Sequence, residues 1–236
     1  MSIWTKIGDF LTNSTGEVLS SLVEKVRTVF AGNAETRRHV TFSIAIIALS
    51  AKMAKADGVV TEDEVDAFRQ IFDVPDSEMD NVARLYNLAR TDIAGFDAYA
   101  HQVKALFPDD PEVLRDVLDG LFHIAKADDI LHEKELEFIE HVAMVFEFDE
   151  QTFERIKMRH VSLKDRDPYF LLEADPEWDF DKLKAHYRKR VSENHPDRLI
   201  ARGVPKEFIA IANERLACIN AAWEQIELER KPLVGA

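Results

Sequence analysis

His195 and Asp197 stand on either side of Pro196 in the stretch ENHPDRL. An imidazole close to a carboxylate suggests either a metal site or an acid/base pair. One His and one Asp do not fill the coordination shell of a metal ion, and an acid/base pair needs a nucleophile that this stretch does not supply. Because proline disfavours helix at the residue before it, the tripeptide is predicted to lie in a loop.

Two predicted helices flank this loop. Asp179 is a suitable N-cap for a helix that runs to about Glu193, and Pro205 opens a longer helix that runs to about Arg230. Apolar residues recur at helical spacing in both, as Phe180, Leu183, Tyr187 and Val191 in the first and Ile209, Leu216, Ile219, Trp223 and Ile226 in the second. Since apolar stripes of this kind pack together, the sequence predicts an antiparallel hairpin. The rest of the first helix is basic, with Lys182, Lys184, Arg188, Lys189 and Arg190.

This arrangement resembles the J-domain, whose mark is His-Pro-Asp between a basic helix and an apolar one. The segments LKAHYRKRVSENHPDRL and LACINAAWEQI carry the resemblance, and RLIARGVPKEF is similar to the DjlA-type branch. The resemblance implies that His195, Pro196 and Asp197 trigger ATP hydrolysis by a DnaK-class chaperone, on which the basic residues dock by charge complementarity. Hydrolysis would take place on the partner, so we expect a co-chaperone with no catalytic residue, and not an enzyme.

The sequence departs from the J-domain pattern at several positions. Arg190 stands where the family usually has Leu, and we expect its head group to extend out of the apolar stripe. His186 replaces the usual Ala, and Trp223 replaces the usual Tyr. Glu193 and Asn194 replace the Lys and Tyr that usually precede the tripeptide. The tripeptide itself and both apolar stripes are intact.

An internal repeat occupies the first part of the chain, where MAKADGVVTEDEV (53–65) matches IAKADDILHEKEL (124–136). Each copy is typical of a helix end, a turn and a new helix, with Thr61 and Glu64 as a capping box in the first copy. The turns are acidic, through Asp57, Glu62, Asp63 and Glu64 in one copy and Asp128, Asp129, Glu133 and Glu135 in the other. Two facing copies would gather these oxygens into a site for a divalent cation. The alternative is that they only cap helices and stabilise helix N-termini.

The paired K-A-D-G and K-A-D-D turns, each before an acidic helix start, resemble the TerB (tellurite-resistance) domain over about residues 20–160. That resemblance implies an all-helical module and favours the cation, since the family has been associated with metal binding. Two functions stay open. The first is a co-chaperone whose TerB-like domain binds a client, an ion or another partner. The second is an acidic, metal-binding stress-response module in which the hairpin is an interaction appendage.

The composition favours an all-α protein in two domains. Only 8 Gly and 8 Pro occur in 236 residues, which favours long helices. The net charge of −14 divides into −13 for residues 1–160 and −1 for the rest, which argues against general nucleic-acid binding. We predict an N-terminal amphipathic segment (1–19), a TerB-like domain (20–160), a linker (161–167) and a J-domain (168–232).

The sequence predicts neither a membrane span nor a secretory signal. The longest apolar stretch reaches Lys52 too early to cross a bilayer, and the N-terminus has no signal-peptide pattern, so cytoplasm is the expected compartment. The amphipathic segment carries a single basic residue, Lys6, and is therefore expected to pack on the bundle. The single cysteine, Cys218, excludes an intrachain disulfide. No sequence pattern identifies a client protein or an oligomeric state.

Overall fold

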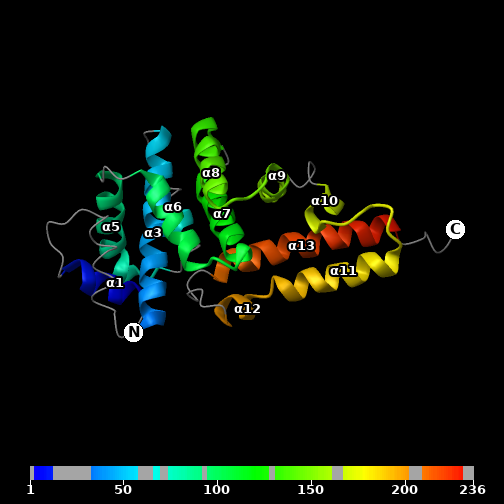
Figure 1. Cartoon of the computed structure of the whole chain (residues 1–236), viewed down its shortest axis with the longest axis horizontal. Coiled ribbons are helices and arrows are strands. Elements are labelled where there is room, and N and C mark those ends of the chain that lie inside the picture. The colour runs from blue at the N-terminus through cyan, green and yellow to red at the C-terminus, as the bar shows by residue number, and fades with distance from the viewer. Residues whose placement is uncertain are drawn as a thin grey trace.

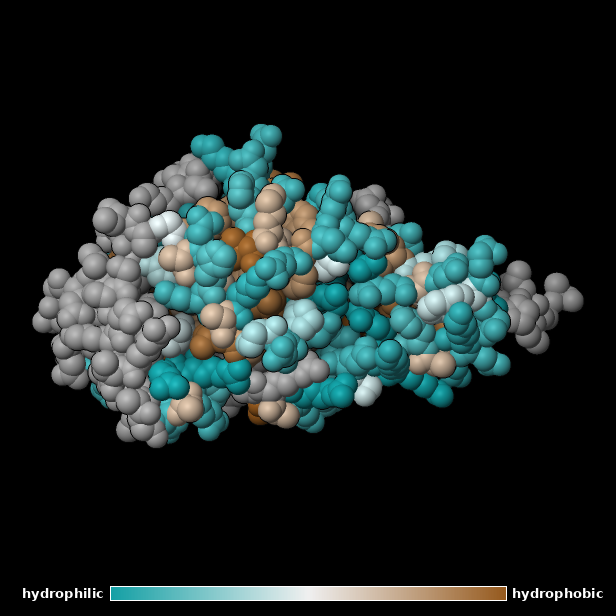
Figure 2. Space-filling model, in the orientation of Figure 1, coloured by the Kyte–Doolittle hydropathy of each residue, from teal (hydrophilic) through white to brown (hydrophobic). Residues whose placement is uncertain are grey.

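The computed structural model describes residues 3–12, 33–57, 66–69, 74–91, 95–127, 131–160, 167–201 and 209–230. Every regular element in these ranges is helical, which confirms the all-α prediction. Figure 1 shows a bundle that contains helices α1 to α9 and an arm that contains α10 to α13. On the face drawn in Figure 2, apolar residues gather over the bundle, whereas the surface of the arm is mostly hydrophilic.

Helix α3 is the centre of the bundle. The bundle helices are α1 (Ile3–Thr12), α3 (Ala34–Asp57), the short 3-10 helix η1 (Asp76–Glu78), α5 (Met79–Thr91), α6 (Phe96–Leu106), α7 (Pro111–Ala125), α8 (Glu133–Val145) and α9 (Glu150–Met158). Residues 40–51 of α3 are buried almost without a break, because α5, α6, α7 and α8 all pack against this helix. A helix that is apolar on all sides requires such a position. Its buried Ser50 hydroxyl donates to the carbonyl of Ile46 over 3.0 Å.

Helix α1 packs against the bundle, as predicted for the N-terminal segment. Trp4 and Ile7 are 1% and 0% exposed and belong to the same hydrophobic core as α3. The second copy of the repeat contains the predicted helix end and helix start, since α7 ends at Ala125 and α8 begins at Glu133. No helix in the described part of the chain is long and apolar enough to span a membrane.

The arm is the predicted hairpin. It consists of α10 (Pro168–Leu172), α11 (Phe180–Glu193), α12 (Pro196–Ala201) and α13 (Ile209–Arg230), and α11 lies alongside α13 (Figure 1). Asp179 caps α11, because its Oδ1 accepts the backbone N–H of Lys182 over 2.8 Å. Tyr187 of α11 stacks on Trp223 of α13 with ring centroids 4.8 Å apart. Leu183 and Ile226 are buried in the same core.

Helix α13 contributes to both hydrophobic cores. Its first turn buries Ile211 and Ala212 in the core of the bundle, whereas Ile219 lies in the core of the arm. Gly120 of α7 permits this close approach, since an added Cβ would lie 2.8 Å from Cδ1 of Ile211. The division of the chain into domains stays a prediction. Of the expected linker (161–167), residues 161–166 lie outside the described residues.

The predicted stripe of α13 needs a correction at the start of the helix. Leu216, which was expected to be buried, is half-buried, whereas Arg215 is buried. The reason is that α13 meets α7 at its start and α11 further along. A single stripe facing α11 therefore does not describe the whole helix.

Candidate functional site

The His-Pro-Asp tripeptide lies at the junction of α11 and α12. His195 is outside both helices, but Pro196 and Asp197 form the first turn of α12. The prediction that all three residues lie in a loop is therefore wrong for two of them. Proline is favoured as the first residue of a helix because the N–H that it lacks would have no helical partner there.

Both polar side chains of the tripeptide are open to solvent. The side chain of His195 is 50% exposed and that of Asp197 is 84% exposed. The backbone N–H of Asp197 donates to Nδ1 of His195 over 3.2 Å. The backbone N–H of Arg198 donates to the carbonyl of His195 over 2.9 Å. The turn is thus held by its own hydrogen bonds while its side chains face outward for recognition.

Asn194 connects the tripeptide to the end of α11. Its side chain is fully buried, and its Nδ2 donates to the carbonyl of Arg190 over 2.6 Å. Its backbone N–H donates to the same carbonyl over 3.0 Å. Two bonds to one carbonyl fix the direction in which the chain leaves the helix, and therefore the position of His195.

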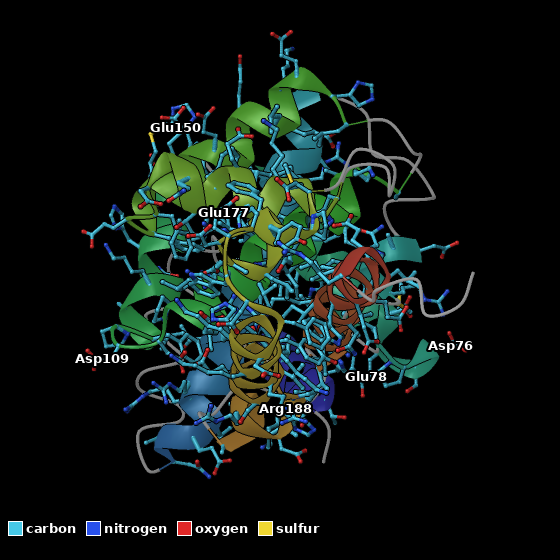
Figure 3. All side chains as sticks on the ribbon, turned by 90° about the vertical axis from the view of Figure 1, so that its right-hand side faces the viewer. Asp76, Glu78, Asp109, Glu150, Glu177 and Arg188 are labelled. Atoms are coloured by element: carbon cyan, nitrogen blue, oxygen red, sulfur yellow. The ribbon has the colours of Figure 1, made fainter. Side chains whose placement is uncertain are left out.

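Four of the five basic residues of α11 form an open cationic surface. Lys182, Arg188 and Lys189 are exposed and Lys184 is half-buried; Arg188 is labelled in Figure 3 on the surface of α11. The Nζ of Lys182 lies 4.1 Å from the ring centroid of Trp178, a cation–π contact. Lys189 lies 3.7 Å from Glu193, one turn further along the helix. We call these four residues the basic face.

The fifth basic residue, Arg190, is not part of this surface. It is 7% exposed, so the expectation that its head group reaches solvent is wrong. Its Nη2 donates to Oε1 of Glu173 over 2.9 Å, and this inward partner holds the guanidinium inside the protein. Burial lowers the pKa of Arg190, although Glu173 opposes this effect. The Leu-to-Arg departure from the J-domain pattern therefore creates a buried ion pair.

Glu173 joins the arm to the bundle. It follows α10 in a left-handed conformation, with a φ of 57°. Besides Arg190, its Oε1 lies 3.6 Å from Nη1 of Arg155 on α9 and 3.7 Å from Nη1 of Arg115 on α7. One carboxylate thus meets three guanidinium groups from three helices. We call Glu173 and these three arginines the Glu173 cluster.

A second ionic contact fixes the start of α13 on the bundle. Arg215 has a fully buried side chain whose Nη1 lies 2.9 Å from Oδ1 of Asp116 and donates to the carbonyl of Glu112 over 3.1 Å. Burial raises the pKa of Asp116 to about 7, against the opposing effect of Arg215. Burial also acts to raise the pKa of Glu112, but Arg215 and other arginines together bring it below its usual value.

A cavity of about 640 Å³ lies where α13 meets the bundle. Its charged lining residues are mostly paired with one another. Asp119 accepts a hydrogen bond from Arg159 and lies 2.9 Å from Nε2 of His160. His123 of α7 lies 2.9 Å from Glu214 of α13. Of these contacts, the one between His123 and Glu214 links the bundle to α13 across the cavity.

The predicted cation site lies mostly outside the described residues. Nothing is described for Glu62, Asp63, Glu64, Asp128 and Asp129, or for the side chain of Asp57 at the end of α3. Glu133 is exposed in the first turn of α8. Glu135 is buried, and its Oε2 accepts the backbone N–H of His132 over 3.1 Å, as in a capping box. Among the described residues no three His, Cys, Asp or Glu side chains could together hold a metal ion, and the site stays a prediction.

Sequence reasoning missed the residues that connect the two parts of the protein. Glu173 gave no signal, because its three partners are distant in the sequence. Arg215 did give one, since it stands four residues after Ile211 and four before Ile219 and so lies in an apolar register. A charged residue in such a register predicts a buried ionic partner.

Comparison with known families supports the resemblance of the first part of the chain to the TerB domain. Residues 43–158 match the family described as tellurite resistance protein TerB, and this range contains both copies of the repeat. No solved structure matches the chain.

Several curated relatives are called co-chaperone protein DjlA. The relative from Photobacterium profundum is 26% identical over 219 residues, which cover 82% of this chain and 79% of the relative. The relative from Coxiella burnetii is 27% identical over 198 residues, or 75% and 73% of the two chains. The relative from Shewanella oneidensis is 41% identical over 64 residues, or 27% and 24%. This chain therefore carries a TerB domain and is a homologue of DjlA co-chaperones over most of its length.

Proposed function

We propose that this protein is a co-chaperone that stimulates ATP hydrolysis by a DnaK-class chaperone. The observation that carries the proposal is the exposed pair of His195 and Asp197 at the end of the helix that presents the basic face. The basic face binds an acidic surface of the chaperone, and the tripeptide contacts the chaperone where it controls hydrolysis. The chemical step takes place on the chaperone, so this chain is not itself an enzyme.

The TerB domain has a separate role in this proposal, which is to recruit a client, an ion or another partner. The −13 charge of residues 1–160 favours basic partners. The exposed basic face argues against an arrangement in which the acidic bundle covers α11. The co-chaperone would act in the cytoplasm, the compartment expected from the sequence, and its partners are proteins rather than nucleic acids.

Single-turnover ATP hydrolysis by a DnaK-class chaperone tests the proposal. Wild-type protein should accelerate hydrolysis, and His195→Gln should not, because the imidazole would no longer be available for the contact. His101→Gln is the matched control, since His101 is also exposed but lies on α6 in the bundle. Equal stimulation by wild type and His195→Gln, or none by wild type, would contradict the proposed function.

A further inference from the structure

A groove lies on the bundle between the end of α8 and the start of α9. It has a volume of about 270 Å³. Ala143 and Phe153 are buried beneath it and Phe148 is half-buried. Met144 borders the groove with 57% of its surface exposed. The two other exposed large apolar residues in the described part of the chain, Ile200 and Leu228, lie in the arm. The bundle thus exposes an apolar side chain beside an apolar floor.

Carboxylates surround this apolar floor. The acidic residues that line the groove are Glu140, Asp149, Glu150 and Glu154. Two of them already have local partners: Oδ1 of Asp149 accepts the backbone N–H of Thr152 over 2.8 Å, and Glu154 lies 2.7 Å from Lys157. Glu140 and Glu150 are exposed, and no ion pair neutralises either within the described residues. Figure 3 shows Glu150 at the edge of the molecule. The groove is therefore apolar at its base and negative at its rim.

We propose that this groove binds a short client segment in which an apolar side chain is flanked by Lys or Arg. The inference rests on the proposed function, in which the TerB domain recruits a client, and it names the surface and the class of segment. The floor removes the apolar side chain from water, and the flexible thioether of Met144 adapts to side chains of different shape. The carboxylates attract basic flanks and repel acidic ones.

The dimensions of the groove favour a flexible segment over a folded partner. Sites for drug-sized ligands usually measure ~300–1,000 Å³, so a groove of about 270 Å³ accommodates a side chain with its neighbours. Stable contacts between folded proteins bury roughly 1,200–2,000 Å², and a single exposed methionine supplies little of the apolar area that such a contact needs. A flexible peptide needs only the apolar floor and the charged rim of the groove in order to bind.

The groove and the chaperone-binding surface lie on different sides of the protein. In Figure 1, α8 and α9 lie along the upper side, whereas α11 and α12 lie along the lower side. A segment bound between α8 and α9 therefore leaves the basic face and His195 accessible. The same molecule can hold a client and contact the chaperone at once.

Fluorescence anisotropy on the full chain tests the proposal with two labelled probes. One is a short peptide with central leucines flanked by lysines, and the other has the same leucines flanked by glutamates. We expect the lysine-flanked peptide to bind at least ~10-fold more tightly. Met144→Lys and Glu150→Lys should each weaken its binding by ~10-fold. Glu137→Lys makes the same charge change as Glu150→Lys at an exposed position of α8 outside the groove, and it should change binding by less than ~2-fold.

Three results would overturn the proposal. The first is equal binding of both peptides, and the second is a loss of binding in Glu137→Lys as large as in Glu150→Lys. The third is a dimer, seen by light scattering, that Met144→Lys dissociates, because the groove would then bind a second copy of the chain. Because no chaperone is present, peptide binding is measured independently of the proposed function. Met144→Lys should stimulate ATP hydrolysis as the wild type does. If peptide binding fails while stimulation is normal, only the proposal for the groove is refuted. If stimulation fails while peptide binding is normal, only the proposed chaperone contact is refuted.

Discussion

Nη2 of Arg190 donates to Oε1 of Glu173 over 2.9 Å, and this pair joins the helix that ends at the tripeptide to the connection after α10. The carbonyl of Arg190 also receives both hydrogen bonds from Asn194, the residue before His195. Glu173 in turn lies near Arg115 and Arg155 of the bundle. A continuous set of contacts therefore leads from the TerB domain to the tripeptide. Through this set the end of α11, directly before the tripeptide, is connected to the bundle.

The Glu173 cluster predicts a loss of stability in Glu173→Gln. The substitution removes the negative charge that three guanidinium groups share and leaves the 9%-exposed side chain of Arg190 without its closest carboxylate. Because the Glu173 side chain is 26% exposed, water compensates in part, and we expect the free energy of unfolding to fall by about 2 kcal/mol. Urea denaturation followed by circular dichroism measures this change.

Glu193→Gln is the control for this prediction. Glu193 also approaches Arg190, with its Oε2 3.9 Å from Nη1, but it is 35% exposed and has no contact of this kind with the bundle among the described residues. Its loss should cost at most ~0.5 kcal/mol. If the two variants lose the same stability, the cluster does not connect the arm to the bundle in the way that the structure indicates.

The basic face predicts that Arg188→Ala weakens chaperone stimulation without weakening the fold. Arg188 is exposed, so the Tm of the Arg188→Ala variant should stay within ~1 °C of that of the wild type. Stimulation of the chaperone should fall by roughly 3- to 10-fold at low salt, and the difference should shrink as salt screens the encounter. Single-turnover hydrolysis at two salt concentrations measures both effects.

Arg190→Ala is the informative comparison for Arg188→Ala. The buried guanidinium supports Glu173 rather than a partner, so its removal should lower the free energy of unfolding by about 2–3 kcal/mol. Loss of stimulation in Arg190→Ala without any loss of stability would show instead that this residue contacts the chaperone directly.

The sequence was sufficient to predict the two long helices of the arm and that they pack together. The spacing of Leu183, Tyr187 and Trp223 predicts the faces that pack, and Asp179 marks where α11 begins, because these features depend on neighbours within a few residues along a helix. The packing of the N-terminal amphipathic segment (1–19) on the bundle was also predicted from the sequence. Local patterns of this kind are present in the sequence before any tertiary contact is known.

The contacts between bundle and arm could not be predicted in the same way. Glu173 meets Arg115, Arg155 and Arg190 only because four elements converge, and no local pattern records that convergence. The burial of Arg190 depends on the same cluster, which is why its predicted exposure was wrong. Arg215 lies in an apolar register, but its partner Asp116 is unidentifiable until α13 is placed on α7.

The acidic turns predict that Ca²⁺ or Mg²⁺ raises the Tm of the protein. A cation that binds only the folded state at 100 times its dissociation constant adds ~2.7 kcal/mol, which corresponds to about 5–10 °C for a chain of this size. Glu133→Gln should reduce the shift, and Glu137→Gln, at an exposed position outside the turns, should retain it. An unchanged Tm with either ion would leave capping as the role of these residues, as the hydrogen bond of Glu135 already illustrates.

Asp116 predicts how stability depends on pH. Burial raises its pKa from 3.8 to about 7 in the folded protein, so between these values the folded state holds a proton that the unfolded state has released. The stabilisation from this group is complete below the unfolded pKa and is lost as the pH rises through the folded pKa. Asparagine at this position is neutral at every pH, so its contribution to the free energy of unfolding does not change in this pH range.

The Tm of Asp116→Asn should therefore rise relative to the wild type between about pH 5 and pH 8, by about 2–4 °C for each kcal/mol that the wild type loses. Thermal melts of both proteins at the two pH values measure this difference. Asp97→Asn, at an exposed position in the first turn of α6, controls for changes in net charge and should keep a constant offset. A constant offset for Asp116→Asn as well would mean that Asp116 is already ionised beside Arg215 at low pH, and that their 2.9 Å contact is a permanent ion pair.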